Sequence, residues 1–245
     1  MAGVAQKEWK EYLVVGKEQK PGPALLLSQP LPTAPLPPPY QLQEVMVPMV
    51  GNRVCNQRYQ NSSTSTGQII KDDMLDSVQV ARIIRHPKYS LEKGAKGGAD
   101  IALLKLEAPV QPSNLIRWIS LPPASSAFPP GTRCWVTGWG NTAFEEPLPP
   151  PYNLQEVEVP IVANEICQQQ YGYVIQDDLL CAGSWGRGTC NGDSGGPLVC
   201  KWRETWVQVG VVSWGKGCGL TNFPGVYARV TSFLPWIRHH IHSSP

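Results

Sequence analysis

The residues best suited to chemistry in this sequence form the segment CNGDSGGPLVC, residues 190–200. A serine acts as a nucleophile when a tight, glycine-rich turn projects its hydroxyl into a cleft and directs backbone N–H groups at the developing oxyanion. Ser194 has glycines two positions before it and at both positions after it, which fits this requirement. For the pentapeptide alone, an ordinary glycine-rich hairpin around a buried Asp193 is the alternative interpretation. The flanking cysteines, and the segment SWGKGCG that follows, argue against that alternative.

The segments that must position this turn are short and strand-like. From Gln41 onward, apolar runs of roughly four to eight residues alternate with Pro, Gly, Asn and Ser, as expected for an antiparallel barrel or sandwich. The clearest runs are 43–50, 79–84, 101–106, 134–140, 155–162, 197–200, 206–215 and 225–230. One convincing helix is predicted from Val230 to His242, with Pro235 tolerated only in its first turn. The pattern therefore predicts an all-β fold with a C-terminal helix.

Several motifs together resemble the trypsin-like serine proteases of the chymotrypsin fold. They are GDSGGP around Ser194, ADIALLKL around Asp100, CWVTGWG from Cys134, SWGKGCG from Ser213 and PGVYARV from Pro224. The segment PLPPPYNLQEVEVPIV further resembles the mast-cell tryptase and mastin branch, and the resemblance runs from about Val78 to the C-terminus. It implies hydrolysis of peptide or protein substrates through a serine acyl-enzyme, without a metal or organic cofactor.

The resemblance implies a double antiparallel β-barrel with the active site between the barrels. Residues 122–245 are expected to hold a complete second barrel and the helix, whereas 78–121 hold only part of the first barrel and a connector. Residues 1–40 are expected to form a proline-rich tail or linker, and 41–77 a duplicate of a second-barrel segment. We expect this incomplete half to be loosely packed and to be cleaved rapidly by an added protease before Leu121.

The duplicate is seen in the close similarity between residues 35–60 and residues 147–172, which match at 17 of 26 positions. The match is too close and too local for the weak pseudo-symmetry of a two-barrel protein. In the second copy, Cys167 is followed by a second cysteine, Cys181. In the first copy, Cys55 is followed at the equivalent position by Asp76. The resemblance thus leaves Cys55 as a free thiol and implies three disulfides: Cys134 with Cys200, Cys167 with Cys181, and Cys190 with Cys218.

The resemblance also assigns roles to individual residues. Ser194 is implied to be the acylated nucleophile, its N–H and that of Gly192 the oxyanion-hole donors, and Asp100 the carboxylate that orients the general base. The implied substrate pocket has Gly188 at its floor, Gly215 and Gly225 as small wall residues, and Ser213 and Trp214 on the strand that pairs with extended substrate. Because the floor has no carboxylate and Arg187 is adjacent, large neutral side chains are the predicted preference.

The general base of the family is absent from this sequence. Family members carry a histidine directly before a cysteine, some tens of residues ahead of the aspartate, and no such motif occurs here. His86 fits an ordinary strand-end HPxY segment, while His239, His240 and His242 fall on the predicted terminal helix. Without a base the Ser194 hydroxyl stays protonated, so we expect the chain to be inactive or strongly impaired.

A second family element is also missing. In the family, a freed terminus resembling Ile-Val-Gly-Gly pairs with the aspartate beside the nucleophile, which here is Asp193, and no such segment occurs. A buried carboxylate without a partner is unfavourable by several kcal/mol in typical cases. We therefore expect Asp193 to adopt another environment and the oxyanion hole to be collapsed, as in a zymogen.

Composition limits the partners and the compartment. The 245 residues carry 21 Lys and Arg against 19 Asp and Glu, and a net charge of +2 indicates neither a nucleic-acid nor an anionic-membrane partner. No run approaches the roughly 20 apolar residues of a membrane span. Seven cysteines, and a sequon at Asn61, favour a secreted protein, although no signal peptide is visible at the start. Assembly into oligomers is an expectation from the tryptase resemblance alone.

Three hypotheses therefore remain open at the level of sequence. The chain is a serine endopeptidase homologue that lacks its base because the sequence joins exons from tandem paralogues. Alternatively, it is a non-catalytic secreted homologue that binds peptides or proteins. The third alternative is a product that does not fold.

Overall fold

The computed structural model describes residues 12–15, 40–41, 79–106, 108–109, 119–150 and 154–242. Cys55, the sequon at Asn61 and nearly all of the 41–77 duplicate lie outside the described residues. The predictions made for those segments therefore remain predictions.

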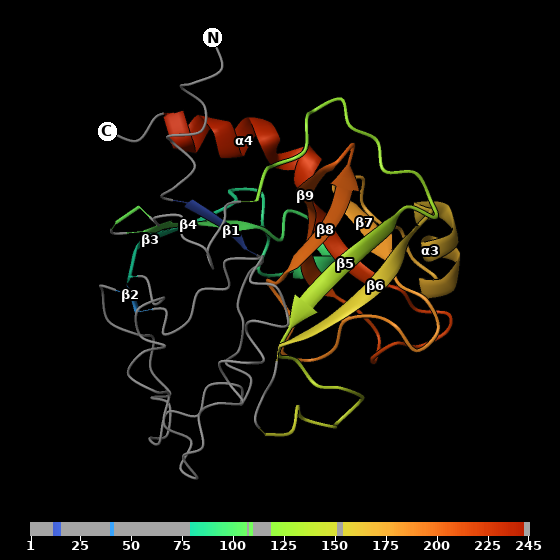
Figure 1. Ribbon diagram of the computed structural model, residues 1–245. Coiled ribbons are helices and arrows are strands. Elements are labelled where there is room, and N and C mark those ends of the chain that lie inside the picture. The colour runs from blue at the N-terminus through green and yellow to red at the C-terminus, as the bar shows by residue number, and fades with distance from the viewer. Residues whose placement is uncertain are drawn as a thin grey trace.

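Six antiparallel strands close into a barrel in the order β10-β7-β6-β5-β8-β9. Figure 1 labels strands β5 to β9 of this barrel. Their bounds are β5 Arg133–Gly138, β6 Gln155–Val162, β7 Leu179–Ala182, β8 Pro197–Trp202, β9 Thr205–Trp214 and β10 Gly225–Arg229. Along β5 the side chains alternate between the interior and the outside, with Cys134 and Val136 buried against the core. Closure pairs every strand of this barrel on both sides, which confirms the expected complete barrel.

A second sheet of four strands lies beside the barrel, in the order β1-β4-β3-β2. The strands are β1 Tyr12–Val15, β2 Tyr40–Gln41, β3 Gln79–Arg85 and β4 Ala102–Leu106. β4 lies in the middle, where Leu103 is opposite both Val14 and Ile84. Strand β1 was missed from the sequence because only four residues carry it. Tyr-Leu-Val-Val favours extended backbone, and β4 offers an edge for it to pair with.

The C-terminal helix α4, Val230–His242, joins the two sheets. Phe233, Leu234 and Ile237 are buried in one cluster with residues around β4 and with Val211 of β9. Figure 1 shows α4 running past the small sheet at one end of the barrel. Pro235 lies inside the helix, in its second turn, and not in the first turn where the sequence analysis placed it. The proline removes one backbone hydrogen bond, and burial of its neighbours in the core compensates for that loss.

Two short helical elements were not predicted from the sequence. α3, Asn164–Tyr171, buries only Cys167, so its apolar pattern is too weak to reveal a helix. It ends at Gly172, whose φ of 75° is the left-handed conformation that glycine adopts easily. The 3₁₀ turn η3, Ala95–Gly97, directly precedes the Asp100 segment.

Three disulfides hold the barrel half together, and they are the pairs that the resemblance implied. They join β5 to β8 (Cys134–Cys200), α3 to β7 (Cys167–Cys181), and the loop before Ser194 to the loop after β9 (Cys190–Cys218). The last of these bonds anchors the nucleophile turn against the loop that follows Trp214.

Candidate active site

Ser194 sits in the turn that leads into β8, and β9 fixes the turn from behind. The Gly195 N–H donates to the Val212 carbonyl at 2.8 Å, and the Val212 N–H donates to the Gly196 carbonyl at 2.9 Å. Gly192 has a φ of +100°, and a Cβ there would lie 2.9 Å from the Gly140 Cα. The turn therefore requires a glycine at this position, as the sequence motif predicted.

The backbone amides of the turn divide into two groups. Those of Asp193, Gly195 and Gly196 donate to backbone carbonyls. Among the described residues, the amides of Gly192 and Ser194 donate to no such acceptor. These two are the amides assigned to the oxyanion hole, and the collapse of that hole remains a prediction.

The Asp193 carboxylate accepts hydrogen bonds from two backbone N–H groups. Its Oδ1 accepts the Gly140 N–H and its Oδ2 accepts the Cys190 N–H, each at 2.9 Å. Burial raises the pKa of Asp193, while these two hydrogen bonds partly oppose the shift. A Cβ at Gly138 or Gly140 would overlap this carboxylate. The two glycines of the CWVTGWG motif therefore leave the space that the carboxylate occupies. The expected change of environment thus takes the form of amide hydrogen bonds.

Asp100 is buried, with 3% of its surface exposed. Its Oδ2 accepts a hydrogen bond of 2.5 Å from the Ser213 hydroxyl at the end of β9. Ser213 directly follows Val212, the residue whose main chain holds both glycines after Ser194. The structure therefore brings the Asp100 side chain to the same end of β9 as the nucleophile turn.

The histidines whose side chains are described lie along α4. The His86 ring packs edge-on against Phe233 and Trp236, at centroid distances of 5.1 and 4.8 Å. His240 packs on Trp236 and on His239. Burial lowers the pKa of His86, and the positive charge of Lys88 adds to this effect. Within the described part of the chain, no three His, Cys, Asp or Glu side chains gather closely enough to hold a metal ion.

Gly188, Gly215 and Gly225, the glycines assigned to the pocket, lie close together. A Cβ at Gly188 would meet only the Gly219 backbone, at 3.7 Å, and a Cβ at Gly215 would meet the Gly225 Cα at 3.9 Å. At Gly225, in contrast, a Cβ would lie 3.0 Å from both the Thr189 and the Tyr227 hydroxyl oxygens. Tyr227 is fully buried, and this burial raises its pKa. The surroundings of Gly225 therefore include two hydroxyl groups, those of Thr189 and Tyr227.

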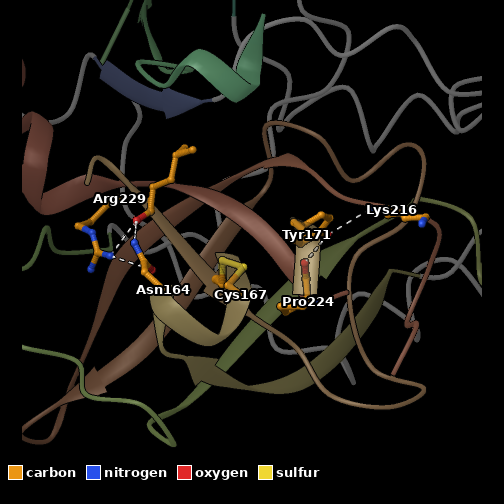
Figure 2. The surroundings of a disulfide bond; sticks show 8 residues. Asn164, Cys167, Tyr171, Lys216, Pro224 and Arg229 are labelled. Carbon is orange, nitrogen blue, oxygen red and sulfur yellow. Dashed lines mark hydrogen bonds between the residues drawn. A yellow bond between two sulfur atoms is a disulfide. The ribbon is translucent and has the colours of Figure 1, made fainter. Parts of the chain in front are cut away.

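Aromatic side chains cluster around Trp214. Tyr171 and Tyr173 pack against the Trp214 ring, at centroid distances of 5.0 and 5.8 Å. Figure 2 shows the Tyr171 hydroxyl between the loops on either side, donating to the Pro224 carbonyl at 2.7 Å and accepting the Lys216 N–H at 3.3 Å. Burial raises the pKa of Tyr171 to about 12, so the hydroxyl remains protonated.

Two lysines flank this aromatic cluster. Lys96 of η3 places its Nζ 4.7 Å from the Tyr173 ring centroid and 5.9 Å from that of Trp214. Lys216 places its Nζ 4.2 Å from the Phe223 ring centroid. The sequence analysis identified Trp214 but missed the tyrosines and the lysines, because their meeting depends on loops distant in sequence.

Comparison with known proteins identifies the family. The trypsin family model matches residues 71–237, which is more than half of the chain. The chain belongs to the trypsin family. It is 51% identical over 171 residues to a protein named tryptase from Mus musculus, a match covering 66% of this chain. It is 44% identical over 173 residues to serine protease 28 from Mus musculus, covering 67% of this chain. Each match spans 62% of the relative's own length.

This trypsin-family chain thus keeps part of the arrangement that the motifs implied. The structure brings Asp100 to Ser213 and holds the Ser194 turn against the same strand. It places His86 in the aromatic cluster of α4. The residue roles themselves remain assignments by resemblance.

Proposed function

We propose that this chain is a serine endopeptidase homologue that accepts extended peptide or protein segments and hydrolyses them poorly or not at all. One observation supports the proposed roles of Ser194 and Asp100. The buried Asp100 carboxylate accepts a hydrogen bond from the Ser213 hydroxyl, beside the residue that holds the Ser194 turn. The carboxylate and the serine turn thus lie at the same end of β9, which is compatible with a carboxylate that acts behind a serine nucleophile.

The expected weakness in hydrolysis follows from the proton on Ser194. In acyl transfer the serine oxygen attacks the scissile carbonyl while a base takes its proton, and the oxyanion-hole amides bind the new oxyanion. The sequence has histidines only at 86, 239, 240 and 242. His86, His239 and His240 pack in the ring cluster along α4. Loss of a triad member in other serine proteases lowers turnover by roughly 10⁴- to 10⁶-fold.

Labelling by a fluorophosphonate tests this proposal, because the reagent modifies only an activated serine hydroxyl. We expect Ser194 to react about 10⁴-fold more slowly than the serine of a competent trypsin-family protease. The variant Ser194→Ala gives the background, and a peptide map locates any label. Labelling of Ser194 at the rate of the competent protease would contradict the proposed impairment.

A second candidate function is peptide binding without hydrolysis, and the lysine-flanked aromatic cluster around Trp214 favours it. Lys96 and Lys216 bring two positive charges to the aromatic rings around Trp214. Extended peptides with acidic side chains should therefore bind more tightly than their amide analogues, by up to about fivefold for each exposed ion pair.

Tryptophan fluorescence during titration with the acidic peptide and its amide analogue measures this preference. Lys216→Gln should reduce it. Lys201→Gln is the matched control, because Lys201 lies over a different ring, that of Trp206. Equal affinity for both peptides would exclude this binding role.

We also propose that the protein is extracellular. Three disulfides are typical of oxidising compartments. None of the helices in the described ranges is both long and apolar enough to cross a bilayer. The exclusion of nucleic acid rests on the small net charge, and assembly into oligomers remains a prediction.

A further inference from the structure

Asp178 lies in the turn before β7, outside the residues assigned to the active site and the substrate pocket, and contacts the backbone beside Asp100. Its Oδ2 accepts the Ala99 N–H at 2.7 Å, joining positions 79 residues apart. Ala99 is only 4% exposed, so water does not take the place of this acceptor.

The backbone that leads into Asp100 is unusual at this contact. Gly98 has a φ of +82° and Ala99 a φ of +56°, a left-handed conformation that alanine rarely adopts. A Cβ at Gly98 would lie 2.5 and 2.8 Å from the two Asp178 carboxylate oxygens. The carboxylate therefore packs directly against the glycine, and its hydrogen bond helps to hold the following residue in its strained conformation.

Asp178 is itself held in place by Arg229 of β10. The Arg229 N–H donates to the Asp178 carbonyl at 2.8 Å, and the guanidinium donates to the carbonyls of Asp177 and Leu179 at 3.1 and 2.8 Å. Figure 2 shows the guanidinium extending toward Asn164, whose Oδ1 accepts a hydrogen bond at 3.4 Å. The turn that carries Asp178 is thus fixed by barrel strand β10 and by α3.

These contacts hold Asp100 at two points. Asp178 fixes the main chain immediately before it, and Ser213 binds its side chain. Both supports come from the barrel half of the molecule. We propose that Asp178 is a positioning residue, which holds the 98–100 backbone so that the Asp100 carboxylate meets the Ser213 hydroxyl. The catalytic meaning of this role rests on the proposed function, whereas the positioning itself does not.

A comparison of Asp178→Ala with Asp178→Asn tests the proposal. The Ala99 amide exchange rate and the Asp100 side-chain ¹³Cγ resonance are both measured by NMR, with Asp100→Asn used to assign the resonance. In Asp178→Ala the Ala99 amide should exchange about tenfold faster relative to the Val209 amide in β9, and the Asp100 resonance should shift. Asp178→Asn retains an acceptor oxygen and should restore both values.

Asp177→Ala is the matched control, because it removes the neighbouring carboxylate but not the hydrogen bond to Ala99. It should leave both measurements unchanged. If Asp178→Ala does not fold, Asp178→Ser replaces it with the same expected result, since the serine side chain is too short to reach Ala99. Unchanged exchange at Ala99 in the variant without the acceptor, or equal loss in Asp178→Asn, overturns the proposal.

The same variants separate this proposal from the proposed function. Neither NMR measurement depends on turnover or on labelling of Ser194. The expected changes at Ala99 and Asp100 would support the positioning role, even if labelling contradicts the proposed impairment. If Ser194 labels as expected but Asp178→Ala changes neither the Ala99 exchange rate nor the Asp100 resonance, the proposed function is supported and the positioning role is contradicted.

Discussion

Gly188, the residue assigned by resemblance to the floor of the substrate pocket, has room for a side chain. A Cβ there would make only ordinary contacts of 3.7 Å with the Gly219 backbone. Gly188→Asp should therefore be accommodated and should place a carboxylate where a basic side chain can reach it. Charge-assisted hydrogen bonds contribute about 1.5–3 kcal/mol, so affinity for an arginine-containing peptide should rise about 10- to 100-fold.

Competition binding against an otherwise identical peptide with phenylalanine at the same place measures this change. Gly188→Ala is the control, because it adds the Cβ without the charge. A Gly188→Asp variant that still prefers phenylalanine would show that the basic side chain does not reach this position.

The residues that could be found from the sequence are those whose chemistry lies within one contiguous motif. Ser194 and its glycines form such a motif, as do Asp100 and the strand that follows it. Asp178 could not be found in this way, since its partner is 79 residues away and an acidic residue in a turn is unremarkable. The sequence feature linked to Asp178 is Gly98. The need for a glycine there is recognised only in the structure, where the Asp178 carboxylate packs against it.

At the scale of elements, the barrel strands β5, β6, β8, β9 and β10 followed predicted runs because alternation and turn residues define them locally, whereas β7, Leu179–Ala182, was not among the predicted runs. β6 matches its predicted range, 155–162, residue for residue. α3 was missed because its packing depends on one disulfide cysteine, and β1 because it needs the edge of β4. Elements that depend on contacts between segments distant in sequence were therefore not predicted from the sequence alone.

The contact between β3 and α4 is predicted to weaken in acid through His86. Burial and Lys88 lower the pKa of His86 below 6.5, while Asp178 opposes this and His240 reinforces it. The folded state therefore binds this proton more weakly than the unfolded chain does. The stabilisation due to neutral His86 is complete above pH 6.5, and it declines as the pH falls from 6.5 toward the folded-state pKa.

His86→Gln removes this titration and tests the prediction. The difference in unfolding free energy between wild type and His86→Gln should fall as the pH is lowered from 7 to 5. Denaturant unfolding across this range measures it, and His239→Gln controls for the loss of a histidine elsewhere on α4. A difference that stays constant with pH would mean that the aromatic contact does not disfavour the protonated ring.

For the molecule as a whole, one buried cluster connects the sheet to the barrel. Leu103 of β4 is fully buried in it, together with Val211 of β9 and Ile237 of α4. Residues from both sheets and from the terminal helix therefore share one core. A cavity on the sheet side should consequently destabilise the barrel side as well, although the barrel alone carries the three disulfides.

Leu103→Ala tests this coupling. Loss of a fully buried leucine should lower the unfolding free energy by about 2–5 kcal/mol. Leu91→Ala, at a position that is 75% exposed, should change it by less than about 0.5 kcal/mol. Urea unfolding is followed by tryptophan fluorescence and by far-ultraviolet circular dichroism. If the core is shared, the urea concentration at the unfolding midpoint should decrease equally in both signals. A separate, unshifted transition for the barrel would show instead that it folds without the sheet, and the Asp100 segment would then join it only as a weakly held attachment.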